Sequence, residues 1–297
     1  MGGLYDGPYL NCAVTHTAVH CCLLAELAPL ATSQIMLLHM MALAMLSGPA
    51  AVPLRARAGP VVGKLRPRLS AEISSSKWSI GTETMDRNLT IYANYQAFLP
   101  PLGAKRARLQ CGWGRCDLTG TGAPYNWGWL DEAVFGLAAM GIKPWLELSY
   151  GNSHYKGGGT NGPGATVPNS LFALEAWAVW VTAVAERYAN VTDEFELWNE
   201  PSLSKANYLP YATLAAVTCR ALHAAHVDDP QWKPLMFYGV MNGGYAGAGP
   251  AFLDGTLPLL EQQLASSGSG LRLADCVAAV TCECRNDHAS LPCDDAI

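Results

Sequence analysis

Short apolar runs alternate with longer runs of helical periodicity through most of this chain. From Trp127 to Met140, for example, apolar residues recur at helical spacing and Gly141 follows, which predicts a helix and its end. Pro100 and Pro101 are expected to stop the first helix, and Asn169 to cap the third. The predicted strands cover residues 79–84, 107–113, 142–150, 194–198, 234–240 and 276–282. The predicted helices cover residues 90–99, 127–140, 170–188, 208–225 and 251–265.

Strands that alternate with helices specify a parallel sheet, and the predicted strands lack the clean alternation of a half-exposed strand. Six consecutive units with no sign of two sheet halves favour an α/β fold of the (β/α)8 TIM-barrel type over a doubly wound sheet. No glycine-rich dinucleotide fingerprint or phosphate loop follows any strand, so no nucleotide cofactor is expected. At about 40 residues per unit, eight units need more chain than is present, so we expect a barrel truncated after its sixth strand.

Composition narrows the function classes. Half of the 297 residues are hydrophobic and only 14% are charged, which excludes a disordered polyelectrolyte and a long solvated coiled coil. The net charge of -5 gives no general attraction to phosphate backbones, so nucleic acid is not an expected partner.

The first 69 residues read as an extension ahead of a partial barrel at residues 70–297. The apolar run Ile35–Leu46 suits a signal-peptide core better than a membrane span, although no Lys or Arg precedes Arg55. Two glycosylation sequons begin at Asn88 and Asn190. We therefore expect the secretory pathway or the extracellular space. A membrane anchor formed by the uncleaved apolar run, and an unstructured extension, are the alternatives.

Ten cysteines are too few for a disulfide scaffold in a chain of this length. Seven of them follow residue 70, an odd number, which leaves at least one thiol unpaired and has room for one bridge. Cys282, Cys284 and His288 form a sparse cluster of metal-ligating types, but their spacing matches no standard zinc pattern. No metal or other cofactor is predicted.

The fourth predicted strand ends in the stretch that carries the chemistry, Phe-Glu-Leu-Trp-Asn-Glu-Pro at residues 195–201. Strand alternation places Glu196, Trp198 and Glu200 on one side. In a barrel the strand ends form the site, so an Asn-Glu pair there can aim a carboxyl group at a glycosidic oxygen and an amide at a sugar hydroxyl. The alternative is an acidic residue at the start of a helix.

Residues 195–203 resemble the acid/base strand of clan A glycoside hydrolases, and the nearest match is glycoside hydrolase family 39, which contains β-xylosidases and α-L-iduronidases. Tyr125-Asn126-Trp127 with Leu130-Asp131, and the stretch at residues 141–149, agree in the same order. The resemblance covers about residues 78–285. It implies that Glu200 is the general acid/base, that Asn199 holds the sugar 2-hydroxyl, and that the substrate is a carbohydrate.

Other candidates are less specific. The family's nucleophile lies on the seventh strand and is expected beyond Ile297, and Glu283 stands where the family usually carries a His. Trp113 could stack on a sugar or simply pack the barrel top, and Glu147 could reach a ligand or form a structural salt bridge. The glycine-rich loop at residues 151–168 could form a rim or lid, or be a disordered insertion.

The sequence leaves three hypotheses about the function open. The leading one is a retaining glycosidase, β-xylosidase-like or a related exo-glycosidase, in which Glu200 protonates the leaving oxygen and later activates water. The second is a carbohydrate-binding barrel that lacks the nucleophile, unless Glu283 or Asp287 substitutes for it. The third, a membrane-tethered interaction domain, depends on the apolar N-terminal run alone.

Overall fold

A computed structural model of the chain describes residues 78–85, 91–201, 207–226, 228–229, 231–239 and 248–281. The strands are β1 (Ser79–Gly81), β2 (Arg106–Gln110), β3 (Lys143–Leu148), β4 (Glu194–Leu197), β5 (Leu235–Gly239) and β6 (Ala279–Thr281). The helices are η1 (Tyr92–Asn94), η2 (Gln96–Phe98), α3 (Leu99–Leu102), α4 (Trp113–Cys116), α5 (Gly128–Ala139), α6 (Leu171–Tyr188), α7 (Tyr208–Ala225), α8 (Ala248–Ser266) and α9 (Leu273–Cys276).

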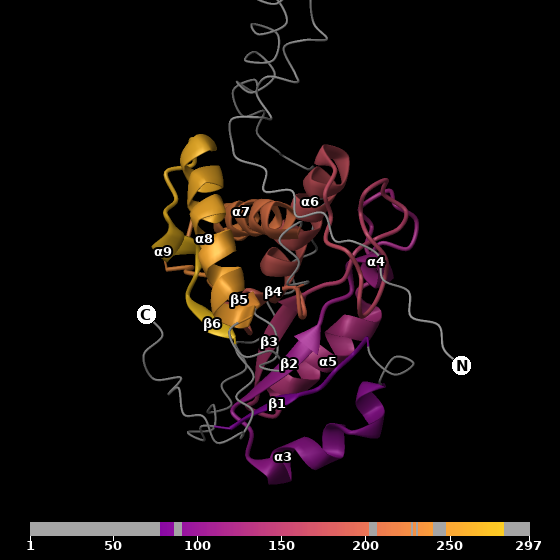
Figure 1. Ribbon diagram of the computed structural model, residues 1–297. Coiled ribbons are helices and arrows are strands. Elements are labelled where there is room, and N and C mark those ends of the chain that lie inside the picture. The colour runs from indigo at the N-terminus through magenta and orange to yellow at the C-terminus, as the bar shows by residue number, and fades with distance from the viewer. Residues whose placement is uncertain are drawn as a thin grey trace, which may run out of the picture. The chain divides into compact units, whose positions relative to one another are not determined.

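All six strands form one parallel sheet in the order of the sequence, from β1 to β6. Neighbouring strands are joined by helical segments, and α6, α7 and α8 pack beside one another (Figure 1). Unreversed strand order is typical of a barrel, whereas a doubly wound sheet reverses direction at its switch point. The predicted α/β class and parallel sheet are confirmed. Closure into eight strands, truncation after the sixth and the boundary at residue 70 stay predictions.

The two faces of the sheet differ in chemistry, although β2, β3 and β4 have no exposed residue and so lack the alternation of a half-exposed strand, as expected. In β2, Ala107 and Leu109 are fully buried in the hydrophobic core shared with the helices. Arg106 and Arg108 alternate with them and point to the opposite face, where they pair with Glu194 and Glu196 of β4. The sheet therefore packs helices on one face and stacks layers of ion pairs on the other.

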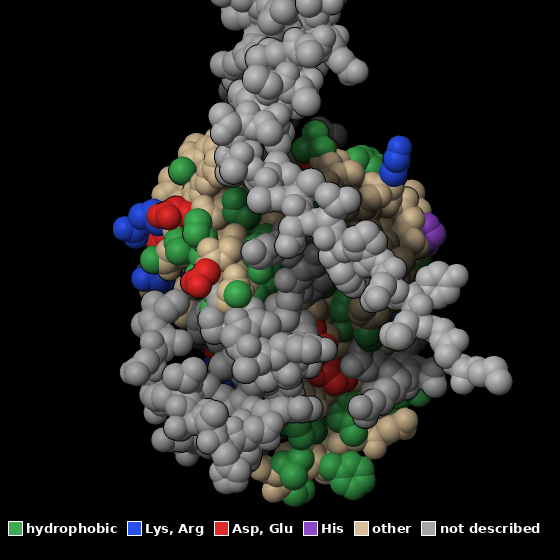
Figure 2. Space-filling view, in the orientation of Figure 1, with side chains coloured by type: hydrophobic (Ala, Val, Ile, Leu, Met, Phe, Trp, Pro, Cys, Tyr) green, Lys and Arg blue, Asp and Glu red, His purple; other side chains and the backbone are tan. Residues whose placement is uncertain are grey.

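The segment after β1 is not the regular helix that the sequence predicted at residues 90–99. Its described part forms two 3-10 turns, η1 and η2, followed by the single α-helical turn α3. Pro100 and Pro101 lie at the start of α3 rather than beyond its end, because the first turn of a helix needs no backbone N–H donors. Phe98 and Leu102 are 68% and 57% exposed, and Figure 2 shows hydrophobic side chains gathered over this segment, low in the view.

Helix ends otherwise follow local rules, with one correction. Gly141 has a φ of 73° just after α5, and Ile142 N donates to Leu137 O at 3.0 Å, so glycine ends this helix as predicted. Helix α6 is capped by Ser170, whose hydroxyl accepts a hydrogen bond from Ala173 N at 3.1 Å. The prediction of Asn169 as the cap is wrong by one residue.

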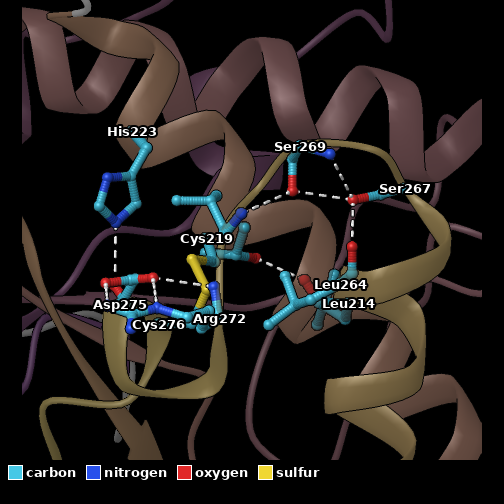
Figure 3. Close-up of a disulfide and its surroundings, with 11 residues drawn as sticks. Leu214, Cys219, His223, Leu264, Ser267, Ser269, Arg272, Asp275 and Cys276 are labelled. Carbon is cyan, nitrogen blue, oxygen red and sulfur yellow. Dashed lines mark hydrogen bonds and ion pairs between the residues drawn. A yellow bond between two sulfur atoms is a disulfide. The ribbon is translucent and has the colours of Figure 1, made fainter.

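One disulfide joins Cys219 of α7 to Cys276, the last residue of α9 (Figure 3). Its Cα atoms are 5.4 Å apart. His223, one turn after Cys219, donates from Nε2 to the carbonyl of Asp275 at 2.9 Å. Cys276 was expected to begin the sixth strand, which instead begins at Ala279. The bridge thus ties the turn that leads into β6 to the core helix α7.

The remaining cysteines of the described residues, Cys111 and Cys116, are buried and unpaired, as the odd count required of at least one. The proposed cluster of Cys282, Cys284 and His288 lies outside the described residues. Within the described part of the chain, no group of three or more metal-ligating side chains is found. No helix in that part is long and apolar enough to cross a membrane, and the run Ile35–Leu46 lies outside it.

Candidate active site

The carboxyl ends of β2, β3 and β4 meet at one edge of the sheet, and the sequence-predicted pair Asn199 and Glu200 lies there. Strand β4 ends at Leu197, and Trp198 N still donates to Leu148 O of β3 at 3.0 Å. Tyr211 of α7 donates from its hydroxyl to the Leu197 carbonyl at 3.2 Å. The backbone that leads to Glu200 is therefore fixed from both sides.

The predicted alternation does not continue past β4, because two residues have left-handed backbone. Trp198 has a φ of 63° and Glu200 a φ of 46°. Such values cost roughly 1–3 kcal/mol for a residue other than glycine and concentrate at functional sites. Trp198 is buried, whereas Glu200 is exposed. The turn thus separates two side chains that a regular strand would place on one side, and brings the Glu200 carboxyl group to the surface.

Arg108 of β2 is the centre of the polar network beneath this edge. Its Nε donates to Glu196 Oε2 at 2.6 Å, and its Nη1 donates to Glu83 Oε1 at 3.0 Å. Nη2 donates to Asn199 Oδ1 at 2.9 Å and also contacts the Glu147 carboxyl group. One guanidinium therefore links the ends of the first four strands and fixes the amide beside Glu200.

A second layer of charge lies below this one, at the start of the same strands. Arg106 Nε donates to Glu194 Oε2 at 2.6 Å, and Lys143 Nζ donates to Glu194 Oε1 at 2.9 Å. These hydrogen bonds to the charged form outweigh burial and lower the pKa of Glu194. This layer joins β2, β3 and β4 without approaching Glu200 and has a structural role.

Glu147 is fully buried and contacts Arg108 and the Ser149 hydroxyl. Burial raises the pKa of Glu147 to about 8, although the Arg108 guanidinium opposes that effect. Burial alone would lower the pKa of Arg108, but Glu147 and Glu196 outweigh it and raise the pKa. Of the two roles that the sequence left open for Glu147, a structural contact with Arg108 is the one observed, and the Glu147 side chain has no exposed surface.

The elevated pKa of Glu147 predicts a pH-dependent stability. Below the ordinary value of 4.5 both the folded and unfolded states carry the proton, so the native state loses stability as the pH rises from about 4.5 to about 8. Gln cannot ionise. The free energy of unfolding of Glu147→Gln should therefore rise relative to that of the wild type, by up to about 1.4 kcal/mol per pH unit between these two pH values.

Urea unfolding at pH 5, 6, 7 and 8 measures this difference. The control is Glu186→Gln, which removes an exposed carboxylate from α6. A difference between Glu147→Gln and wild type that stays constant or shrinks from pH 5 to 8 would contradict a protonated Glu147.

Trp113 does not serve as a sugar-stacking platform, which corrects the sequence prediction. It begins the short helix α4 instead of ending β2, and it is 0% exposed. Its ring stacks on Tyr155 at a centroid distance of 4.9 Å and packs edge-on against Trp177 at 5.5 Å. Of the two roles that the sequence left open for Trp113, packing is the one observed.

The loop at residues 151–168 packs against this aromatic cluster and is not a disordered insertion. Tyr155 donates from its hydroxyl to Asp117 Oδ2 at 2.6 Å, and Asn152 Nδ2 donates to the Asp117 carbonyl at 2.9 Å. The Asp117 carboxylate also accepts from the backbone N–H of Gly120 at 2.9 Å. A buried carboxylate thus holds two loops together, and a role as a rim or lid stays a prediction.

Four residues around Asn199 were not found from the sequence: Arg108, Glu196 as its partner, Tyr150, whose hydroxyl accepts from Asn199 Nδ2, and Gln110, which donates to the same hydroxyl. The signal for the first two was present, because charged residues at every second position occur in β2 (Arg106, Arg108) and in β4 (Glu194, Glu196). Opposite charges at this spacing on two parallel strands indicate ion pairs across one face. Glu283, the remaining predicted site residue, lies outside the described residues.

No protein-family model matches this chain, and no curated protein sequence matches it. Solved structures do resemble it. One is a family 39 glycoside hydrolase from Bacteroides cellulosilyticus, with 21% identity and a TM-score of 0.45 over 67% of this chain and 37% of that chain. Another is a monomeric β-xylosidase from Caulobacter crescentus, with 22% identity and a TM-score of 0.42 over 69% of this chain and 41% of that chain. A family 39 glycoside hydrolase from Xanthomonas axonopodis has 24% identity and a TM-score of 0.38 over 59% and 37%.

The matches span about two fifths of the length of these solved structures. At these identities and scores the likeness does not identify an activity. The activity has to be argued from the residues at the strand ends.

Proposed function

We propose that this chain is a glycoside hydrolase that cleaves O-glycosidic bonds by a retaining mechanism, with Glu200 as the general acid/base. Its substrate would be a carbohydrate of the kind taken by β-xylosidases or related exo-glycosidases. The observation that carries the proposal is the placement of Glu200. It is an exposed carboxyl group at the carboxyl end of β4, next to an asparagine whose amide is held in a fixed orientation.

Each residue then has a defined task. Glu200 gives its proton to the leaving oxygen in the first step and takes a proton from water in the second. Asn199 donates a hydrogen bond from Nδ2 to the sugar 2-hydroxyl, an interaction that strengthens as the oxocarbenium-like transition state forms. Arg108 holds the Asn199 carbonyl from below.

The mechanism also needs a second carboxylate as nucleophile. Glu147 is too deeply buried, and Glu83 and Glu196 are paired with Arg108. We place the nucleophile outside the described residues; Glu283 and Asp287, the two carboxylates that could substitute for it, also lie there. Two carboxyl groups about 5 Å apart are the geometry of a retaining enzyme, and a solitary Glu200 would favour the alternative, a carbohydrate-binding barrel.

We further propose that the protein folds in the secretory pathway. The disulfide between Cys219 and Cys276 supports this, because such bonds persist in oxidising compartments. Asn190, the first residue of a glycosylation sequon, is exposed.

Replacing Asn199 with Ala tests the substrate contact. We expect a fall in kcat of about 100-fold on a 2-hydroxy glycoside such as an aryl β-xyloside, with a smaller change in KM, because the lost hydrogen bond is strongest in the transition state. The control is the matching 2-deoxy substrate, on which the loss should shrink to a few fold. Equal losses on both substrates would assign Asn199 a structural role only.

A further inference from the structure

The side-chain amide of Asn199 is bonded at both of its ends. Arg108 Nη2 donates to Oδ1 at 2.9 Å, and Nδ2 donates to the Tyr150 hydroxyl oxygen at 2.8 Å. A guanidinium has only donors, so its partner on the amide has to be the oxygen. This fixes which end of Asn199 faces Arg108 and which end faces Tyr150.

Tyr150 is itself held in place from three sides. It is buried, at 1% exposure, and its ring packs edge-on against Trp198 at a centroid distance of 5.8 Å. Gln110 of β2 donates from Nε2 to the same hydroxyl oxygen at 3.2 Å, while Gln110 Oε1 accepts from Met85 N at 2.7 Å. The phenol oxygen is thus an acceptor anchored to the residues after β1, to β2 and to the end of β3.

We propose that Tyr150 is a positioning residue that, together with Arg108, locks the Asn199 amide so that the group facing a bound sugar is an N–H. An amide nitrogen carries two protons, and Tyr150 takes one of them, which leaves the second for an acceptor on the ligand. A rotated amide would present its carbonyl oxygen instead and could not donate to the sugar 2-hydroxyl. The identity of the ligand in this inference rests on the proposed function. The fixed orientation of the Asn199 amide does not depend on that function.

The test is Tyr150→Phe in the full chain, with two readouts. The first is hydrogen exchange of the Asn199 side-chain amide by NMR, its signal identified by its loss in Asn199→Asp. Exchange should be at least several fold faster in Tyr150→Phe, because one N–H loses its acceptor. The second is kinetics on aryl β-xylosides, where kcat should fall about threefold to tenfold at nearly constant KM. On the 2-deoxy substrate kcat should hardly change.

The matched control is Tyr188→Phe. Tyr188 is as deeply buried, and its hydroxyl donates to Asp131 Oδ1 at 3.0 Å, on the outer helices α5 and α6. It should lower stability and leave Asn199 exchange unchanged. If Tyr150→Phe leaves Asn199 exchange at the wild-type rate, the inference is overturned whatever the activity. If the wild type turns over no glycoside but exchange accelerates in Tyr150→Phe, the lock stands and only the proposed function fails.

Discussion

Replacing Arg108 with Met should lower the free energy of unfolding by about 3–5 kcal/mol. The methionine fills similar space but leaves the Glu196 carboxylate, which is almost wholly removed from water, without its cation. An unpaired buried charge costs more than the pair contributes, so the loss should exceed that of an ordinary core substitution. Urea unfolding at pH 7 measures it.

Two further variants test whether the effect is specific to Arg108 or follows the loss of any arginine. Arg272→Met removes a cation from an exposed pair with Asp275 and should leave the urea midpoint nearly unchanged. Arg108→Lys keeps the positive charge but loses the planar guanidinium group. Its free energy of unfolding should lie between those of Arg108→Met and the wild type. An Arg108→Met protein as stable as the wild type would show that the ion-pair layer does not hold the sheet together.

Replacing Glu200 with Gln should reduce hydrolysis of an unactivated glycoside, such as xylobiose, by about 1,000-fold. The amide keeps the size of the carboxyl group but has no proton to transfer. Because Glu200 is exposed, the variant should keep the wild-type melting temperature. The measurement is kcat/KM on xylobiose, with circular dichroism melting alongside it.

Glu186→Gln is the matched control, since it makes the same change at an exposed position on α6. It should leave turnover unchanged. Unchanged turnover of xylobiose by Glu200→Gln would remove Glu200 from the reaction, and a large fall in its melting temperature would indicate a structural role.

The order and type of most elements could be predicted from the sequence because they depend on local patterns. The helix predicted at residues 208–225 matches α7, and β4 begins at Glu194 as expected. The segment before Pro100 could not be assigned correctly, because apolar residues at helical spacing do not distinguish successive 3-10 turns from one helix.

Only some residues of the candidate site could be predicted from the sequence. The Asn199-Glu200 pair was found because its residues are adjacent in sequence. Arg108 lies 91 positions before Asn199, and the contact between them depends on the register of three strands. The positive φ of Glu200 and the burial of Trp113 arise from tertiary packing, so no local sequence pattern predicts them.

The most direct test of the central claim, that Glu200 is the acid of a glycosidase, is a leaving-group series. The measurement is kcat/KM of wild type and Glu200→Gln on aryl β-xylosides whose phenols range from strongly to weakly acidic. The ratio of wild type to variant should be small for the most acidic phenol, which leaves without a proton, and should rise toward about 1,000 for the least acidic. A ratio that stays constant across the series, or a wild type that cleaves none of these glycosides, would contradict the account.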